Sequence, residues 1–338
     1  MSVLLAGTFP AGDPASRSTL AACLNHLEGE EVTVIAAAPD GVYEQFGLRS
    51  VSIANPAAVA REIAAADVLA FAGGPPFAEA SRSANGGPSV TAVAAMEAEA
   101  KALGKRIAFV GVAVDDLAQP VARACARNLP RHADLFVARD RRSARRFASF
   151  GAPAPMWIGA DPVWLGVPAS TAGRRSDGGV VAAVAGTDGS DALAGQIADL
   201  ESSGRAVSLL PWGPGGFSAV GRLASALRSP RVLRAPADMA AARDSFLGAA
   251  AVVCRDEHPV IAAASAGVSS VDPTTTPGGL AAAVDEAASS PPGPGELETH
   301  VLRAEECMRL LKVLLANGRS DEADCITGLE LGPEPWPS

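Results

Sequence analysis

Residues His132 to Trp164 have the sequence HADLFVARDRRSARRFASFGAPAPMWIGADPVW, and this stretch decides the predicted fold. The apolar run Leu135–Ala138 has the length of a buried strand, and Asp140 is a favoured N-cap for a helix that begins at Arg141. Gly151 is a natural stop for that helix. Arg139 then lies at the carboxyl end of a strand beside a helix N-terminus, where α/β sheets bind charged ligands.

Apolar strand-like runs and amphipathic helical stretches alternate on both sides of this segment, which predicts parallel sheets covered on both faces. We expect an α/β protein with two doubly wound, Rossmann-like domains that face a cleft. The predicted divisions are an N-terminal domain (1–165), a linker (166–179), a C-terminal domain (180–290), a C-terminal helix (296–317) and a tail (318–338). This arrangement resembles the GT-B architecture of many glycosyltransferases.

Composition excludes several classes of function. The net charge of −9 and the pI near 5.0 argue against general binding to nucleic acid or to an anionic membrane surface. The five cysteines form no CxxC pair and have no metal-ligand spacing, so we expect reduced thiols and no metal site. The N-terminus has no basic signal-peptide region, and its apolar run is too short to span a membrane, which predicts a cytoplasmic protein.

Four segments resemble the polysaccharide pyruvyl transferase family. LAFAGGPPF contains Gly73-Gly74 where the family has a glycine-rich turn, and VARDRRS, followed by FGAPAP and ADPVW, matches its strand, Arg-Asp-x-x-Ser, helix and Asp-Pro order. LLPWGPG and AAAVVCRDEHPVIAAASAGVSSVDP match two segments of the second domain. Two departures stand out. Arg255 and His258 are separated by two residues rather than one, and the N-terminal loop keeps only Gly12-Asp13.

The resemblance implies an enzyme that transfers the enolpyruvyl unit of phosphoenolpyruvate onto two hydroxyls of a sugar or glycan, giving a pyruvate ketal. Phosphoenolpyruvate is then a co-substrate, and no resident cofactor is expected. Arg139 and Arg255 follow strands in different domains and would face each other across the cleft. Since arginine binds carboxylates and phosphates well, both would then hold the donor anion. His258 is the implied general acid, and Asp13, Asp116 or Glu257 is a candidate base.

Further residues are expected to line the substrate site. They are Ser143 of the Arg-Asp-x-x-Ser motif, Gly73 and Gly74 of the turn, Glu257 beside the histidine, and Trp212 as an apolar or sugar-stacking wall.

Structural interpretations of the same residues remain open. Arg139 has Asp140 and Asp161 as possible ion-pair partners, and His258 is a possible helix cap. Gly73-Gly74 is also a turn signal, and Trp212 is equally a candidate core residue.

Two other functions remain open as well. The first is a GT-B glycosyltransferase that uses a nucleotide sugar, and the second is a catalytically degenerate relative that acts as a binding or partner subunit. The altered N-terminal loop and the Arg-Asp-Glu-His spacing are the reasons to consider this last alternative. The apolar side of the helix at 296–317 either packs on the first domain or forms a homodimer contact.

Overall fold

The computed structural model describes residues 1–7, 9, 12–73, 77–79, 89–152, 156–167, 179–186, 190–213, 215–274 and 279–317. Most of the predicted linker, the whole predicted tail and Gly74 lie outside these residues.

Within the described residues, the first sheet has seven parallel strands in the order β3-β2-β1-β4-β5-β6-β7. The strands are β1 Ser2–Ala6, β2 Glu31–Ala36, β3 Ser50–Ser52, β4 Val68–Ala72, β5 Arg106–Val112, β6 Leu135–Ala138 and β7 Trp157–Ile158. The helices among them are α1 Pro14–His26, α2 Pro39–Phe46, α3 Pro56–Ala65, α4 Val90–Ala102, α5 Pro120–His132, α6 Arg141–Ser149 and the short 3-10 helix η2 Pro162–Gly166.

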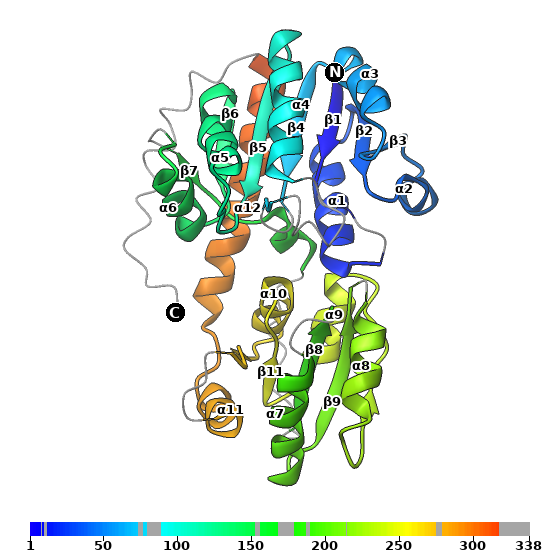
Figure 1. Cartoon of the computed structure of the whole chain (residues 1–338), viewed down its shortest axis with the longest axis vertical. Coiled ribbons are helices and arrows are strands. Elements are labelled where there is room, and N and C mark those ends of the chain that lie inside the picture. The colour runs from blue at the N-terminus through cyan, green and yellow to red at the C-terminus, as the bar shows by residue number, and fades with distance from the viewer. Residues whose placement is uncertain are drawn as a thin grey trace.

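The second sheet, over the same described residues, has five parallel strands in the order β10-β9-β8-β11-β12. They are β8 Val180–Ala185, β9 Val207–Trp212, β10 Arg231–Val232, β11 Ala251–Val253 and β12 Ser270–Val271. The accompanying helices are α7 Ser190–Ser202, α8 Gly216–Ala224, α9 Met239–Phe246, α10 Glu257–Ser265, α11 Leu280–Ser289 and α12 Pro294–Asn317. The predicted class, α/β with two doubly wound domains, is confirmed, and Figure 1 shows one domain above the other.

Local sequence explains where many of the helices begin. Asp140 accepts a hydrogen bond from the Ser143 amide at 2.6 Å, which confirms it as the cap of α6. Side chains that cap their helices in the same way are Asp13, Asn55, Ser89, Asp161 and Asp238. Proline occupies the first turn of α1, α3, α5 and η2, where the missing N–H would have no helical partner.

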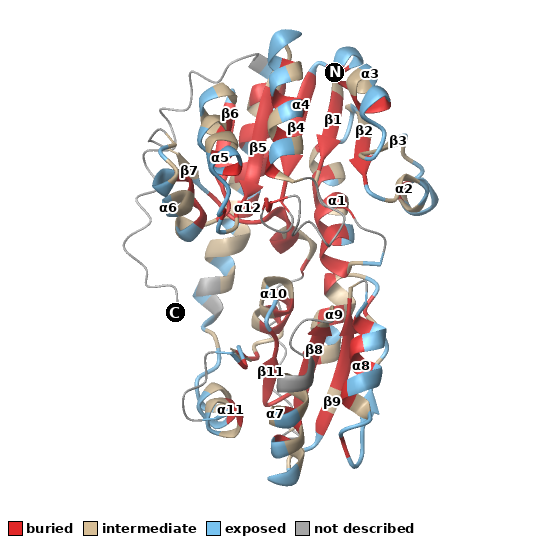
Figure 2. Cartoon of the chain, in the orientation of Figure 1, coloured by how far each residue is buried: buried red, intermediate tan, exposed pale blue. Residues whose placement is uncertain are grey.

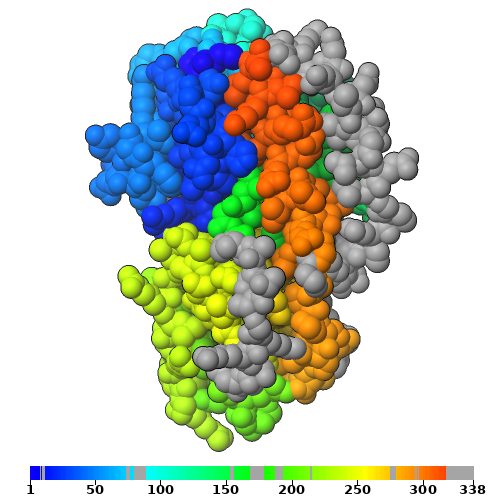
Figure 3. Space-filling view, turned by 180° about the vertical axis from the view of Figure 1, so that it is seen from behind, coloured from blue at the N-terminus to red at the C-terminus, as the bar shows by residue number. Residues whose placement is uncertain are grey.

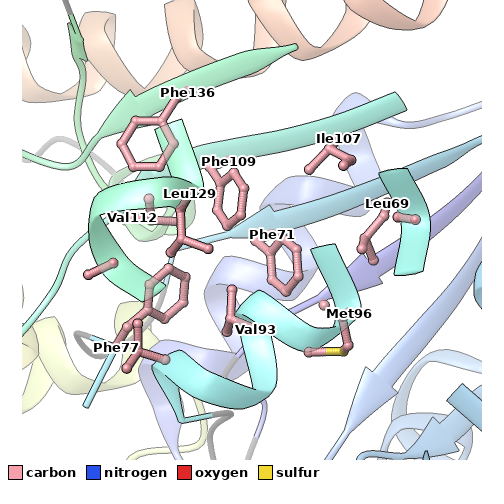
Figure 4. Close-up of a cluster of buried hydrophobic side chains, with 14 of the residues drawn as sticks. Leu69, Phe71, Phe77, Val93, Met96, Ile107, Phe109, Val112, Leu129 and Phe136 are labelled. Atoms are coloured by element: carbon pink, nitrogen blue, oxygen red, sulfur yellow. The ribbon is translucent and has the colours of Figure 1, made fainter. Parts of the chain in front are cut away.

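The first sheet is buried on both faces, as Figure 2 shows for its strands. On one face, helices α3, α4, α5 and α6 cover a cluster that includes Phe71, Phe77, Phe109 and Phe136 (Figure 4). The rings of Phe71 and Phe109 stack with centroids 4.7 Å apart. Because both faces exclude water, the central strands β1, β4, β5 and β6 are almost entirely apolar rather than alternating.

The other face of the first sheet is covered by α1 and by the last helix, α12. The residues Cys307–Leu315 of α12 contribute to this cluster, and the Arg106 guanidinium donates to the Leu314 carbonyl at 2.6 Å. A Cβ at Gly159 would overlap the Cys307 sulfur, so the close approach of α12 requires glycine there. The apolar side of α12 therefore packs on the first domain, which is one of the two alternatives that the sequence left open.

Helix α12 also contacts the boundary between the domains. Its Ala304 belongs to a buried cluster that joins Ala15 and Trp164 of the first domain to Trp212 and Phe246 of the second. His300 stacks on the Trp164 ring, with centroids 4.7 Å apart. Seen from behind in Figure 3, α12 runs from the second domain along the first, so one helix ties the two together.

The sequence prediction missed several elements and misplaced the starts of some helices. Helices α2 and α11 and strands β3 and β12 were not expected. Helix α10 was expected to start at Pro259 or Val260, but it starts at Glu257, which places His258 within the first turn. Proline is tolerated there because amides of the first turn have no partner inside the helix. None of the helices in the described part of the chain combines the length and apolar character needed to cross a membrane.

Replacing Leu311, which is fully buried under the first sheet, tests the contribution of α12 to stability. We expect Leu311→Ala to lower the free energy of unfolding by roughly 2–5 kcal/mol in urea titrations, because it removes buried methyl groups and leaves a cavity. The matched control is Leu302→Ala on the same helix, whose side chain is 63% exposed. Equal losses in the two variants would contradict the packing of α12 on the first domain.

Candidate active site

The candidate site lies where the carboxyl ends of the two sheets meet. In the first sheet, the strand order reverses between β1 and β4, and in the second it reverses between β8 and β11. Parallel α/β sheets bind ligands in the crevice at such switch points. Gly73 follows β4, and helix α10 follows β11 directly, so both reversals contribute residues to the same region (Figure 1).

Arg139 follows β6 and is 8% exposed. Its guanidinium lies 3.4 Å from an Asp140 oxygen and 3.9 Å from an Asp161 oxygen. A shorter contact of 2.5 Å joins Arg139 Nη2 to Glu257 Oε2 of the second domain. The structural interpretation of Arg139, pairing with Asp140 and Asp161, is therefore confirmed, and a third carboxylate from across the boundary is added.

His258 is the second charged group at this boundary. Its Nε2 atom lies 3.8 Å from Asp161 Oδ2, too far for a hydrogen bond but close enough for strong electrostatic attraction. Burial by itself lowers the pKa of the His258 imidazole, but Asp161, Asp13 and Glu257 outweigh it and raise the pKa above its ordinary value.

Asp161 is the centre of the cluster and is only 1% exposed. Its Oδ1 accepts the Val163 amide at 2.9 Å, while its Oδ2 has no hydrogen-bond partner among the described residues. His258 Nε2 and Thr19 Oγ1 are also buried without such a partner in this part of the chain. Buried polar atoms of this kind are costly unless something satisfies them, so their grouping at the domain boundary makes this region the candidate site.

Gly73 is what allows Asp161 to lie here. A Cβ at position 73 would be 2.7 Å from Asp161 Oδ1 and 2.9 Å from Thr19 Cγ2, and its φ of +52° also favours glycine. The structure thus gives Gly73 a packing role beside the site.

Asp13 caps helix α1 at the edge of the same cluster. Its Oδ2 accepts the Ser16 amide at 2.8 Å and also the Ser16 hydroxyl. Its Oδ1 lies toward the second domain, 3.8 Å from where a Cβ of Gly213 would be. One carboxylate oxygen is therefore fixed by the helix, and the other faces the domain boundary.

Glu257 differs from Asp140 and Asp161, the other carboxylates around Arg139, because it belongs to the second domain. Burial of the carboxyl group raises the pKa of Glu257, and the Arg139 guanidinium opposes this effect. Glu257 is thus the acidic partner that the second domain supplies to Arg139.

Other residues expected at the site lie elsewhere or play structural parts. Ser143 is buried in the first turn of α6, and Trp212 is buried in the cluster between the domains. Arg255 is exposed at the end of β11. Asp116 is on the surface and pairs with Arg146 at 2.9 Å. Gly74 lies outside the described residues.

Sequence reasoning underestimated Asp161, which it considered only as a partner of Arg139. Its signal was the Asp-Pro pair that follows the last strand of the first domain, in ADPVW. No group of three or more His, Cys, Asp or Glu side chains suited to a metal ion occurs in the described ranges.

Comparison with known proteins identifies the family. The family model described as polysaccharide pyruvyl transferase matches residues 16–271, so this chain belongs to that family of transferases. The match includes β4, β6, β11 and α10, the elements that position the site. No curated protein sequence matches the chain.

Solved structures of similar architecture include an epimerase and a glycosyltransferase. The Methanocaldococcus jannaschii UDP-GlcNAc 2-epimerase, in complex with UDP-GlcNAc and UDP, has a TM-score of 0.61 at 12% identity, covering 93% of this chain and 100% of that one. A glycosyltransferase from Rickettsia africae has a TM-score of 0.54 at 10% identity, covering 91% and 92%. At these identities the likeness shows the fold alone, and that fold is GT-B-like.

The environment of His258 makes a testable prediction about its protonation. We expect Asp161→Asn to lower the pKa of the imidazole, because it removes a negative charge beside Nε2 while keeping the shape of the side chain. NMR titration of the histidine ring signals measures this directly. Asp116→Asn, on the surface, is the control and should leave the titration of His258 unchanged. An unaltered pKa in Asp161→Asn would show that Asp161 does not hold the charge of the imidazole.

Proposed function

We propose that this chain transfers the pyruvyl group of phosphoenolpyruvate to two hydroxyls of a sugar or glycan acceptor, forming a pyruvate ketal. The observation that carries the proposal is His258. It is a histidine buried against carboxylates at the junction of two domains, in a chain that belongs to the pyruvyl transferase family. No cofactor is required by this chemistry.

His258 suits the role of general acid. The reaction must place a proton on the methylene carbon of the donor as positive charge develops on the neighbouring carbon. The carboxylates around His258 raise the pKa of the imidazole, which increases the protonated fraction near neutral pH. The same carboxylates lie where they would stabilise the positive charge that develops in the transition state.

Arg139 is the proposed cation for the carboxylate or phosphate of the donor. In the structure its guanidinium is committed to acidic side chains, so the donor must replace one of them. Glu257 is the one that would be replaced, because it reaches Arg139 from the other domain and because burial of its carboxyl group favours the neutral form. An incoming anion would then take over the contact that Glu257 makes with Arg139.

The proposed reaction has two bond-forming steps. One acceptor hydroxyl forms a C–O bond to the central carbon of the donor, His258 protonates the methylene group to a methyl group, and Asp13 takes the hydroxyl proton. The second hydroxyl then displaces phosphate, which leaves with the second proton. Proton transfer from Asp13 back to His258 restores both groups. Asp13 lies close enough to His258 to raise the pKa of the imidazole.

Titration calorimetry with phosphoenolpyruvate, run beside UDP and GDP, is the first test. We expect phosphoenolpyruvate to bind and the nucleotides not to bind. Binding of a nucleotide without phosphoenolpyruvate would instead indicate a glycosyltransferase. A folded protein that binds neither would indicate the degenerate relative, and either of these results would refute the proposal.

The variant His258→Gln separates donor binding from chemistry. We expect it to retain phosphoenolpyruvate binding but to release phosphate roughly 10²–10⁴-fold more slowly in the presence of an acceptor, because it has no acidic proton. His26→Gln, at the end of α1, is the control. Full activity in His258→Gln would exclude this residue as the acid.

Glu257→Gln tests the proposed exchange at Arg139. Neutralising the competing carboxylate should tighten phosphoenolpyruvate binding by roughly fivefold. The reason is that a glutamine amide binds the Arg139 guanidinium about 1 kcal/mol more weakly than a carboxylate does, so the donor displaces it more easily. Glu62→Gln is a matched control, because Glu62 also contacts an arginine at 2.5 Å but lies on helix α3, away from the site. Unchanged or weaker donor binding in Glu257→Gln would contradict the exchange.

A further inference from the structure

A separate pocket of about 170 Å³ lies beside the site, at the carboxyl ends of β1 and β2. Helices α1 and α2 form two of its walls, and Pro236 and Ala237 close it from the second domain. It is smaller than the roughly 300–1,000 Å³ of pockets that hold drug-sized ligands, so it fits a single ring rather than a nucleotide.

The lining of this pocket is divided by chemistry. Its apolar part consists of Phe9, Leu20, Val42 and Phe46, which also belong to or pack against a core cluster of the first domain. Such a surface suits the C–H face of a sugar ring.

The polar part of the lining includes Asp13, Arg17 and Gln45. Their planar polar groups have the hydrogen-bonding capacity to engage neighbouring hydroxyls. Apolar surface with a few polar groups is typical of a small-molecule site.

Arg17 gives the pocket a charge preference. Its side chain is exposed on the first turns of α1, and no ion pair of its guanidinium occurs among the described residues. In a chain with a net charge of −9, a pocket arginine whose guanidinium makes no ion pair with any described residue is available for an anion. The N-terminus of α1 lies at the same place and favours negative charge.

We infer that this pocket binds a sugar ring that carries a negative charge, as a phosphate or a uronate, and that this sugar is the acceptor. The identification as the acceptor rests on the proposed function. Asp13 provides the link, because it lines the pocket and also acts on the pKa of His258. A hydroxyl of a sugar in the pocket would therefore reach the proposed base.

Calorimetry with glucose 1-phosphate, glucuronate, glucose and inorganic phosphate tests the inference. At least one anionic sugar should bind, more tightly than glucose or inorganic phosphate. Arg17→Ala should weaken that binding by about tenfold or more, the loss expected for a charge-assisted hydrogen bond. Gln45→Ala should weaken binding of all three sugars. Arg61→Ala, an exposed arginine of helix α3, is the matched control.

The identity of the anionic sugar that binds shows which kind of charge the pocket recognises. Binding of glucose 1-phosphate alone assigns the charge to a phosphate, and binding of glucuronate alone assigns it to a uronate. The inference is overturned if neither anionic sugar binds, if Arg17→Ala has no effect, or if inorganic phosphate binds as tightly as the sugars.

Phosphoenolpyruvate is titrated into the same preparations, and Arg17→Ala should leave its affinity unchanged. Sugar binding without phosphoenolpyruvate binding would support the sugar-binding pocket and refute the proposed function. Phosphoenolpyruvate binding without sugar binding would support the proposed function and refute the sugar-binding pocket.

Discussion

The buried carboxylate of Asp161 is the constraint on which the rest of the site depends. A charge that is 1% exposed is stable only with cations near it, and Arg139 and His258 provide them from opposite sides of the domain boundary. The same carboxylate explains Gly73, because a side chain there would overlap it. Asp161 also caps η2, the short helix whose Trp164 enters the cluster between the domains.

Hydrophobic packing holds the domains together around these charges. Buried ion pairs contribute little net stability, since desolvation offsets the attraction between the charges. The cluster that includes Trp164, Trp212 and Phe246 excludes water from the boundary, and α12 crosses from that cluster to the core of the first domain. Packing therefore fixes where the sheets meet, and the charged residues then determine what the junction can bind.

The charge balance of the junction shapes the chemistry proposed for it. Carboxylates outnumber the two cations, so the proposed donor would have to exchange with one of these anions at Arg139. The excess of acid also raises the pKa of His258. In the family pattern one residue separates the arginine from the histidine, whereas here Asp256 and Glu257 do. Glu257, which contacts Arg139, lies within this altered segment.

The sequence by itself determined the local structure and the family. Strand Leu135–Ala138 and the Asp140 cap depend on neighbouring residues, so the pattern of apolar and capping residues was enough to predict them. It also singled out Arg139 and His258, through motif resemblance. Only the tertiary structure decided the partners of these residues, which are Glu257 for Arg139 and Asp161 for His258. It also decided that Trp212 is buried rather than facing a substrate. Such contacts depend on how two sheets bring distant strand ends together, and periodicity and capping carry no information about that.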